Sequence, residues 1–529
     1  MRKHRTWVAL AVAVACTETR APEGALAPEA LLNVSAGEPR RFVVVFNQPH
    51  GLPRDVERIV AGAGGTISDA LPQIGAISVR SSNPAFAKQL AKVPGVKVVA
   101  EDPDVQLIPD TQELSTFAAA DATNTPGPAE PPGPDDPAGG TEPLYHQQWD
   151  KMRMNASLSG SYAVQLGRRE VVVAILDTGI EITHPDLLPN LDIARSRSFV
   201  PTEPSIDDEN GHGSWCASAV ASPINQFGIS GVAPNVTIVA LKVADRQRRG
   251  NLFWLAAALV YAGEQRFDIA SMSISGLASH ASSQQMLTVL QRAINFARAS
   301  GVTPIAGLGN NLRDLSDGDF FESSILWPAE MPGVIGVSAT GYLNHRSWYS
   351  NYGMGKTDVS APGGAVLGQH PPPTYRGGGA VLGAWAPETI ESISPDRREE
   401  QCTPDGICHY YRWIEGTAMA AHNAAGVAAL IISQYGDFTP DGSRKFHMSP
   451  QAVESILQRT ANNQPCPEPN SQNFTVSPGP PFGRPVTITT TCRGEAGGYT
   501  SYFGKGIVDA FKAVTEGPGS GAADVATRR

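Results

Sequence analysis

Five apolar runs of strand length, separated by helical patterns, constrain the fold more than any other feature of the sequence. They are residues 171–176, 236–243, 269–274, 302–306 and 334–337. Stretches between them, such as residues 252–264 and 283–299, have the apolar spacing that is typical of helices. Strands that are apolar at every position occur where helices cover both faces of a parallel sheet. The sequence therefore predicts an α/β fold with a doubly wound, mainly parallel sheet, whose ligands bind at the carboxyl ends of the strands.

Polar residues stand where several of these elements meet. Asp177 ends the first apolar run, and His212 opens a helix of small residues within the segment Asn-Gly-His-Gly-Ser. Asn310 closes the fourth run after Gly-Leu-Gly, and Ala418 lies in the segment Glu-Gly-Thr-Ala-Met-Ala-Ala, which leads into an apolar helix. A carboxylate at the end of a buried strand is costly unless it has a partner. Singly, these residues are typical of a helix cap, a core histidine and a turn.

In this order, however, the four segments resemble the signatures of the subtilisin family of serine proteases. The resemblance covers residues 144–515 and includes matches at residues 148–149, 327–329, 349–353, 358–363 and 504–510. It implies that Asp177 orients the imidazole of His212, that His212 is the general base, and that Asn310 is the oxyanion donor. It also implies that the substrate pocket is lined by Ser273, Ile274, Ser275, Gly307, Leu308 and Gly309. Core packing remains the alternative for Ile274 and Leu308.

Ala418 departs from the family, which places its catalytic serine at this position. A methyl group cannot act as a nucleophile, and the geometry excludes rescue by Thr417, Cys216 or His422. The chain as written is therefore predicted to be catalytically silent, although its cleft can still bind peptides. The alanine is either a deliberate inactivation or the mark of a natural pseudoprotease that binds peptides or regulates. Trp215, His422 and Asn423, which also depart from the family, favour the second explanation.

Residues 41–109 read as a small α+β unit ahead of the main domain. Strands are expected at residues 42–46, 74–79 and 96–100, and helices at residues 54–63 and 85–92. The unit resembles the inhibitor-type (I9) propeptide of subtilisin-like proteases, which implies an intramolecular inhibitor and folding aid. A Pro/Gly-rich linker (residues 110–143) follows, then the peptidase domain (residues 144–516) and a disordered tail (residues 517–529).

The N-terminus has the pattern of an export signal. Arg2, Lys3 and Arg5 precede an apolar run, and small residues end at Ala15, so residues 1–15 are predicted to be a signal peptide. Cys16 could instead carry lipid and tether the protein to a membrane through residues 16–40. No later stretch is long enough to span a bilayer. We expect an exported protein that is extracellular, periplasmic or attached to the cell envelope.

The remaining cysteines agree with an oxidising compartment. Cys402 and Cys408 flank a Thr-Pro-Asp-Gly turn, and Cys466 and Cys492 bracket a Pro/Thr/Ser-rich insertion. Each pair is expected to form a disulfide, with metal binding as the rival interpretation. Cys216 is left unpaired, and a buried core thiol is the simplest interpretation of it.

The rest of the sequence bounds cofactors and partners. The net charge is −10 and no basic block points to nucleic acid. We expect a monomer that acts on protein or peptide substrates and requires no cofactor. Structural calcium is frequent in the family, but no ligand spacing is readable, and Asp207-Asp208-Glu209 reads as a solvated turn. Two insertions, residues 364–412 and 462–500, either shape the cleft or bind a partner, or are solvated excursions.

Overall fold

The computed structural model describes residues 39–108, 142–278, 281–316, 324–366, 375–439, 444–446, 448–476, 486–494 and 498–518. The expected signal peptide and nearly all of the tether, linker and tail lie outside these residues and stay predictions.

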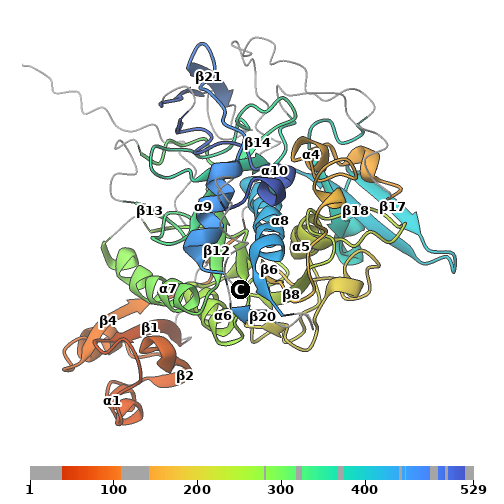
Figure 1. Cartoon of the computed structure of the whole chain (residues 1–529). Coiled ribbons are helices and arrows are strands. Elements are labelled where there is room, and N and C mark those ends of the chain that lie inside the picture. Colours follow the sequence, from red (N-terminus) through yellow and green to blue (C-terminus); the bar gives the residue numbers. More distant parts are fainter. Residues whose placement is uncertain are drawn as a thin grey trace, which may run out of the picture.

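A seven-stranded sheet forms the centre of the main domain (Figure 1). Its strand order is β15-β14-β12-β10-β6-β8-β7, and every neighbouring pair is parallel. The strands are β6 (Val172–Asp177), β7 (Arg197–Ser198), β8 (Thr237–Lys242), β10 (Ile269–Met272), β12 (Thr303–Gly307), β14 (Ile335–Thr340) and β15 (Val359–Pro362). The five apolar runs all lie in this sheet, so the sequence placed its central strands correctly.

Helices cover both faces of this sheet. In β6, Val173 and Ile175 belong to the apolar core that includes α5 (His212–Ala221) and α8 (Thr417–Tyr435). The alternate residues Val172, Ala174 and Leu176 belong to the core that includes α6 (Leu252–Glu264) and α7 (Ala281–Ala299). Successive side chains of a strand point to opposite faces, which is why residues 172–176 of β6 are all apolar. The doubly wound α/β fold is confirmed.

Shorter elements complete the main domain. The helices are α4 (Trp149–Arg153), α9 (Pro450–Thr460) and α10 (Ala510–Thr515). The antiparallel pairs are β11 (Gly276–Ala278) with β13 (Ile325–Trp327), and β19 (Asp437–Phe438) with β20 (Arg444–Phe446).

The N-terminal unit is a four-stranded antiparallel sheet with two helices (Figure 1, lower left). Its elements are β1 (Arg40–Phe46), α1 (Val56–Gly62), β2 (Thr66–Leu71), β3 (Ala76–Ser81), α2 (Phe86–Leu90) and β4 (Val96–Glu101), in sheet order β2-β3-β1-β4. Phe42, Val44 and Phe46 pack under the helices, whereas Val43 and Val45 join the core of α7. The unit is therefore docked on the main domain through the helix-free face of its sheet.

One strand of this unit, β2, escaped prediction. Only Leu71 of its six residues is buried, and Ser68 and Asp69 make its pattern polar. Because β2 is an edge strand with little packed surface, its sequence lacks the alternation that identifies strands.

Both insertions contain regular structure in their described parts. The first forms a three-stranded sheet of β16 (Val381–Trp385), β17 (Arg398–Cys402) and β18 (Cys408–Ile414), whose hairpin projects at the right of Figure 1. The second forms a hairpin of β21 (Ser471–Val476) and β22 (Val486–Thr491). The interpretation as a solvated excursion is wrong for β16, which is buried throughout, and for the buried second half of β18. It stays open for β17, which has no buried residue.

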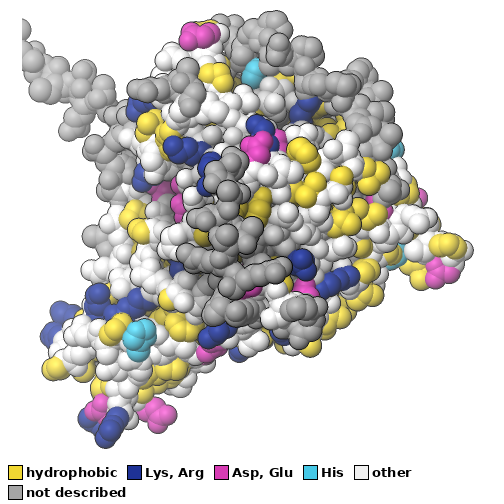
Figure 2. All heavy atoms as spheres, viewed as in Figure 1, with side chains coloured by type: hydrophobic (Ala, Val, Ile, Leu, Met, Phe, Trp, Pro, Cys, Tyr) yellow, Lys and Arg dark blue, Asp and Glu magenta, His cyan; other side chains and the backbone are white. Residues whose placement is uncertain are grey.

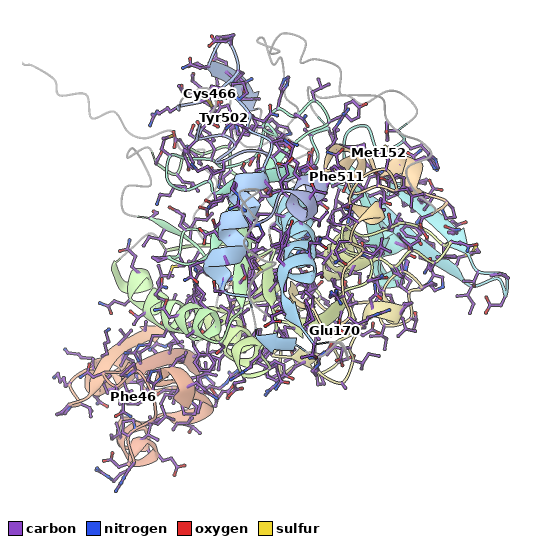
Figure 3. The ribbon with its side chains drawn as sticks, viewed as in Figure 1. Phe46, Met152, Glu170, Cys466, Tyr502 and Phe511 are labelled. Atoms are coloured by element: carbon purple, nitrogen blue, oxygen red, sulfur yellow. A yellow bond between two sulfur atoms is a disulfide. The ribbon has the colours of Figure 1, made fainter. Side chains whose placement is uncertain are left out.

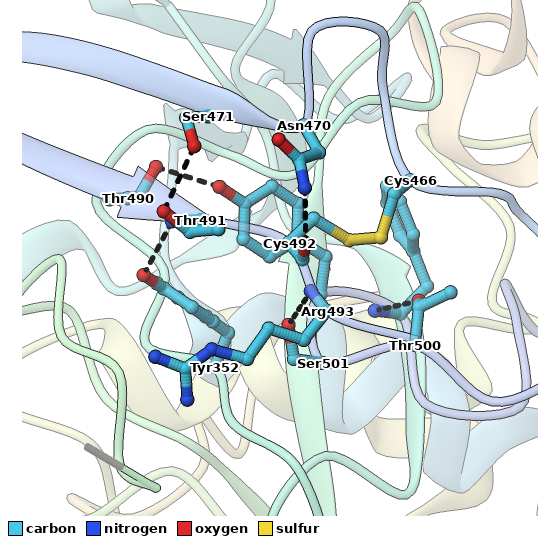
Figure 4. The surroundings of a disulfide bond; sticks show 12 residues. Tyr352, Cys466, Asn470, Ser471, Thr490, Thr491, Cys492, Arg493, Thr500 and Ser501 are labelled. Atoms are coloured by element: carbon cyan, nitrogen blue, oxygen red, sulfur yellow. Dashed lines mark hydrogen bonds between the residues drawn. A yellow bond between two sulfur atoms is a disulfide. The ribbon is translucent and has the colours of Figure 1, made fainter. Parts of the chain in front are cut away.

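Both expected disulfides are present. Cys402 pairs with Cys408 between β17 and β18, and Cys466 pairs with Cys492 beside the second hairpin. Around the second bond, the Tyr502 hydroxyl donates to Thr490 Oγ1 at 2.7 Å (Figure 4). Cys466 and Tyr502 lie at the end of the molecule opposite Phe46 of the N-terminal unit (Figure 3). The unpaired Cys216 is buried.

Candidate active site

Asp177 lies at the carboxyl end of β6, at the centre of the sheet. Its side chain is fully buried and accepts a hydrogen bond from the Thr178 backbone N–H at 2.8 Å. Burial acts to raise the pKa of Asp177, but the adjacent His212 outweighs it and holds this pKa below its usual value. Asp177 is therefore ionised at neutral pH and can hold an imidazole.

His212 is the first residue of α5 and faces Asp177. Its Nδ1 lies 2.9 and 3.0 Å from the two carboxylate oxygens. Its Nε2 is buried and has no hydrogen-bond partner among the described residues. A carboxylate on Nδ1 fixes the tautomer that leaves Nε2 unprotonated, so Nε2 can accept a proton.

Asp208 holds the start of α5 in place. Its Oδ1 accepts from the N–H groups of Asn210 and Gly211, and its Oδ2 accepts from the N–H and hydroxyl of Ser214. A carboxylate at this position satisfies N–H groups that the helix itself cannot. The interpretation of Asp208 as part of a solvated turn is wrong, because its side chain is fully buried.

Ala418, the second residue of α8, stands beside His212 at the edge of a small pocket. The lining residues are Ile108, His212, Ser273, Ile274, Ser275, Gly307, Gly309, Asn310, Thr417 and Ala418. All of these lining residues except Ile108 and Thr417 were predicted from the sequence to belong to the site. Leu308 differs: its side chain is fully buried in the core rather than in the pocket wall.

Asn310 follows β12 and is oriented by α8. Its Oδ1 accepts from the backbone N–H and the hydroxyl of Thr417, both at 2.9 Å. Because a backbone N–H can only donate, these bonds fix the oxygen end of the amide and direct the NH2 group away from Thr417. The Thr417 hydroxyl also accepts from Gly309 N–H at 2.9 Å, so it is committed to structure.

The end of the N-terminal unit enters this cleft as an extra strand. β5 (Val105–Gln106) pairs antiparallel with β9 (Arg249–Gly250). Leu107 N–H donates to Arg248 O at 3.0 Å, and Leu107 O accepts from Ser275 N–H at 2.8 Å. The backbone of Leu107 therefore pairs with both walls of the cleft, and the Ile108 side chain reaches the pocket.

Asp102 anchors that strand. Its carboxylate accepts from the N–H groups of Leu252 and Phe253 at 3.1 and 3.2 Å, at the start of α6. Burial raises the pKa of Asp102 to about 6, although Arg41 and these two N–H groups oppose the rise. The role of Asp102 was not predictable from local sequence, because it depends on a helix 150 residues away.

The first insertion packs on the helix that carries His212. The Trp215 Nε1 donates to Arg412 O at 3.1 Å, and the Trp215 ring lies against Gly383, where an added Cβ would come within 2.4 Å. Trp385 lies equally close to Gly211. These contacts explain Trp215: it anchors the inserted sheet.

Asn423 also has a structural role. Its Oδ1 accepts from Lys151 Nζ at 2.7 Å, and its amide nitrogen donates to Asp150 Oδ2 at 3.2 Å. Lys151 and Asp150 form a fully buried ion pair, which requires such additional hydrogen bonds.

Within the described residues, one group of three side chains has the chemistry and spacing to hold a metal ion, namely Asp177, Cys216 and His422. None of the described helices has both the length and the apolar content of a membrane span. On the face shown in Figure 2, acidic, basic and apolar side chains are interspersed.

Comparison with known proteins decides the family. Residues 168–479 match the model of the subtilase family, Peptidase S8. This chain belongs to the subtilase family. Subtilisin BL of Lederbergia lenta is 38% identical over 205 residues, which cover 39% of this chain and 68% of that protein. M-protease of Shouchella clausii is 33% identical over 261 residues, which cover 49% of this chain and 53% of that protein.

Solved structures agree in fold. An alanine mutant of the epidermin leader peptide processing serine protease of Staphylococcus aureus has a TM-score of 0.63 at 19% identity, covering 90% of this subtilase and 99% of that chain. Fervidolysin of Fervidobacterium pennivorans, a keratinolytic enzyme, has a TM-score of 0.61 at 21% identity. The match covers 92% of this chain and 62% of that chain.

Proposed function

We propose that this subtilase is the precursor of an exported serine endopeptidase that is silent as written because Ala418 occupies the position of the nucleophile. The observation that carries the proposal is the buried Nε2 of His212, which has no partner among the described residues and lies in the same pocket as Ala418 and Asn310. A serine hydroxyl at position 418 would supply the partner that this nitrogen lacks.

In the serine form, each group has one task. The hydroxyl oxygen attacks the peptide carbonyl while His212 Nε2 takes its proton, and Asp177 stabilises the imidazolium that results. The Asn310 NH2 group donates to the oxyanion, and His212 then returns the proton to the leaving amine. None of these reaction steps requires a cofactor. Calcium remains a proposal without a ligand set among the described residues.

We further propose that residues 41–109 act as an inhibitory propeptide. The pairing of β5 with β9 and of Leu107 with Ser275 supports this, because a peptide held by backbone hydrogen bonds blocks the cleft to substrates in the same way. Cleavage would fall between residues 109 and 143.

The alternative is a natural pseudoprotease that binds peptides. Its support from sequence is weakened, since Trp215 and Asn423 have structural roles that do not depend on lost catalysis. Retention of Asn310 and of the His212–Asp177 pair favours a protease lineage.

The test is Ala418→Ser, compared with the parent and with Ala418→Ser combined with His212→Ala. The single variant should hydrolyse casein, be blocked by a serine-directed phosphonate and appear as a shortened chain. The parent and the double variant should neither hydrolyse casein nor appear as a shortened chain. If the single variant is folded yet neither cleaves nor self-processes, the pseudoprotease is the better account.

A further inference from the structure

A buried group of metal-ligating side chains lies directly behind the candidate dyad. The thiol of Cys216, the imidazole of His422 and the carboxylate of Asp177 each offer a ligand atom, and these atoms lie within 4.8 Å of one another. The three residues come from α5, α8 and β6, and all are fully buried. Of these three residues, the proposed hydrolysis uses only Asp177. It gives Cys216 and His422 no role.

The ring of His422 is held at both nitrogens by serine hydroxyls. Its Nδ1 lies 2.5 Å from Ser271 Oγ, and its Nε2 lies 2.6 Å from Ser273 Oγ. Ser273 Oγ is in turn 3.4 Å from Cys216 Sγ. Metal-binding histidines typically have their second nitrogen fixed by a hydrogen bond of the kind that Ser271 makes. Because each ring nitrogen of His422 already has a serine hydroxyl as its partner, a metal ion bound at Nε2 would displace Ser273 Oγ from that nitrogen.

We propose that Cys216, His422 and Asp177 form a binding site for a thiophilic divalent cation such as Zn²⁺ or Cd²⁺, and that occupation of this site inactivates the dyad. A sulfur, a nitrogen and a carboxylate oxygen are the ligand types that Zn²⁺ takes, whereas Ca²⁺ and Mg²⁺ take oxygen alone. Binding replaces the S–H bond of Cys216 by a metal–sulfur bond and releases one proton to solvent. No electron is transferred.

The effect on the dyad follows from the shared carboxylate. Both oxygens of Asp177 lie within 3.0 Å of His212 Nδ1, and Cys216 Sγ is 3.7 Å from the same nitrogen. A cation bound to Asp177 would compete with His212 for that carboxylate and leave the imidazolium unsupported. Ser273, which lines the pocket and contacts both Cys216 and His422, marks the route of entry.

The binding test uses the full chain with Cys16→Ser, so that Cys216 is the one thiol outside the two disulfides. Titration with Cd²⁺ should produce the ultraviolet cadmium–thiolate charge-transfer band, saturating at one equivalent and reversed by Zn²⁺ but not by Ca²⁺. Cys216→Ser should abolish the band. His422→Gln should weaken Cd²⁺ binding by roughly 10- to 100-fold, while His146→Gln, remote from the site, should leave it unchanged.

Undiminished Cd²⁺ binding by folded His422→Gln would overturn the proposal, because the thiol alone would then account for it. Thermal unfolding identifies variants that fail to fold, and His422→Asn provides a second neutral replacement. A further arm rests on the proposed function: in the Ala418→Ser chain, Cd²⁺ should inhibit casein hydrolysis, with recovery on adding a chelator. Absence of the charge-transfer band in the Cys16→Ser chain counts against the site, whereas an inactive Ala418→Ser chain that still binds Cd²⁺ counts only against the proposed function.

Discussion

At the scale of single residues, the site is built from side chains whose other polar atoms are already occupied. Asp177 holds the Nδ1 of His212, and Thr417 holds the Oδ1 of Asn310. What remains directed to the pocket is one basic nitrogen and one amide NH2 group. Such preorganisation is what electrostatic stabilisation of an oxyanion requires.

Asn310→Asp tests the amide donor in the Ala418→Ser chain. Aspartate keeps an oxygen for Thr417 but replaces the donating NH2 group by a carboxylate oxygen. We expect kcat to fall by about 10²- to 10³-fold with little change in KM, because the donor acts on the transition state. Asn295→Asp, exposed on α7, makes the same change in charge and should not alter kcat. Equal loss of activity in both variants would contradict the role of Asn310.

The sequence predicted the residues whose chemistry is unusual for their position, and missed those that only support them. Asp177 and His212 stood out because polar groups at the ends of apolar elements need an explanation. Asp208 did not, since an acidic run next to Asn and Gly is typical of an exposed turn. Its burial arises from the packing of α5 on β6, which a local pattern does not contain.

At the scale of elements, the inserted sheet is coupled to the helix of His212. Gly383 of β16 lies against Trp215 of α5, and Ala384 N–H donates to Ser218 Oγ at 3.0 Å. The disulfide that closes the turn between β17 and β18 was predictable from cysteine spacing. The packing was not, because it joins segments that are far apart in sequence.

Gly383→Val should expose this coupling. The valine side chain would clash with the Trp215 ring. Overpacking of this kind lowers the free energy of unfolding by roughly 1–3 kcal/mol. We expect a lower midpoint of thermal unfolding and, in the Ala418→Ser chain, a lower kcat, because α5 must shift. Ile407→Val, at the exposed tip of the same sheet, is the control and should change neither. A stability loss with unchanged kcat would mean that the sheet does not position His212.

Asp186 links the same sheet to the turn after β6. Its Oδ2 accepts from the Tyr411 hydroxyl at 2.8 Å, and burial raises the pKa of Asp186 to about 8. In the unfolded chain the pKa of this carboxyl has the ordinary aspartate value of 3.8. The folded state therefore binds more protons between these values, and the free energy of unfolding should fall as pH rises through this window.

Asp186→Asn should remove this pH dependence, because the amide is a neutral replacement for the protonated acid. Denaturant unfolding at about pH 5 and about pH 9 should show the variant gaining on the parent at the higher pH, by an amount on the order of a few kcal/mol. Asp437→Asn, at an exposed position, should follow the parent at both pH values. A parent whose stability does not fall between the two pH values would refute this account.

At the scale of the whole molecule, the N-terminal unit is held on the main domain at several separate places. The open face of its sheet packs on α7, Asp102 contacts the start of α6, and β5 occupies the cleft. The sequence indicated a separate small unit, and the family resemblance indicated that this unit acts as an intramolecular inhibitor. It could not indicate Asp102, because the capped N–H groups belong to another element.

Docking of this unit should depend on pH through Asp102. Burial raises the pKa of Asp102 to about 6 when the unit is docked, from the ordinary aspartate value of 3.8. Docking therefore takes up a proton between these values, so it should be tightest below about pH 4, weaken as pH rises through about 6, and then level off. Asp104 has the opposite sign: burial opposes, but the hydrogen bond and charge of Arg41 lower its pKa, so its contribution is lost as pH falls.

The measurement uses the Ala418 chain with a specific protease site placed between residues 110 and 141, so that the separated unit is not digested by its own partner domain. After cleavage, the dissociation constant should rise by roughly 10- to 100-fold between about pH 4 and about pH 7. Asp102→Asn should flatten this rise, since the amide mimics the protonated acid, and Asp104→Asn should steepen it. A dissociation constant that falls with pH in the parent would show that Asp102 binds α6 as a carboxylate with a low pKa, and that its helix-capping bonds outweigh its burial.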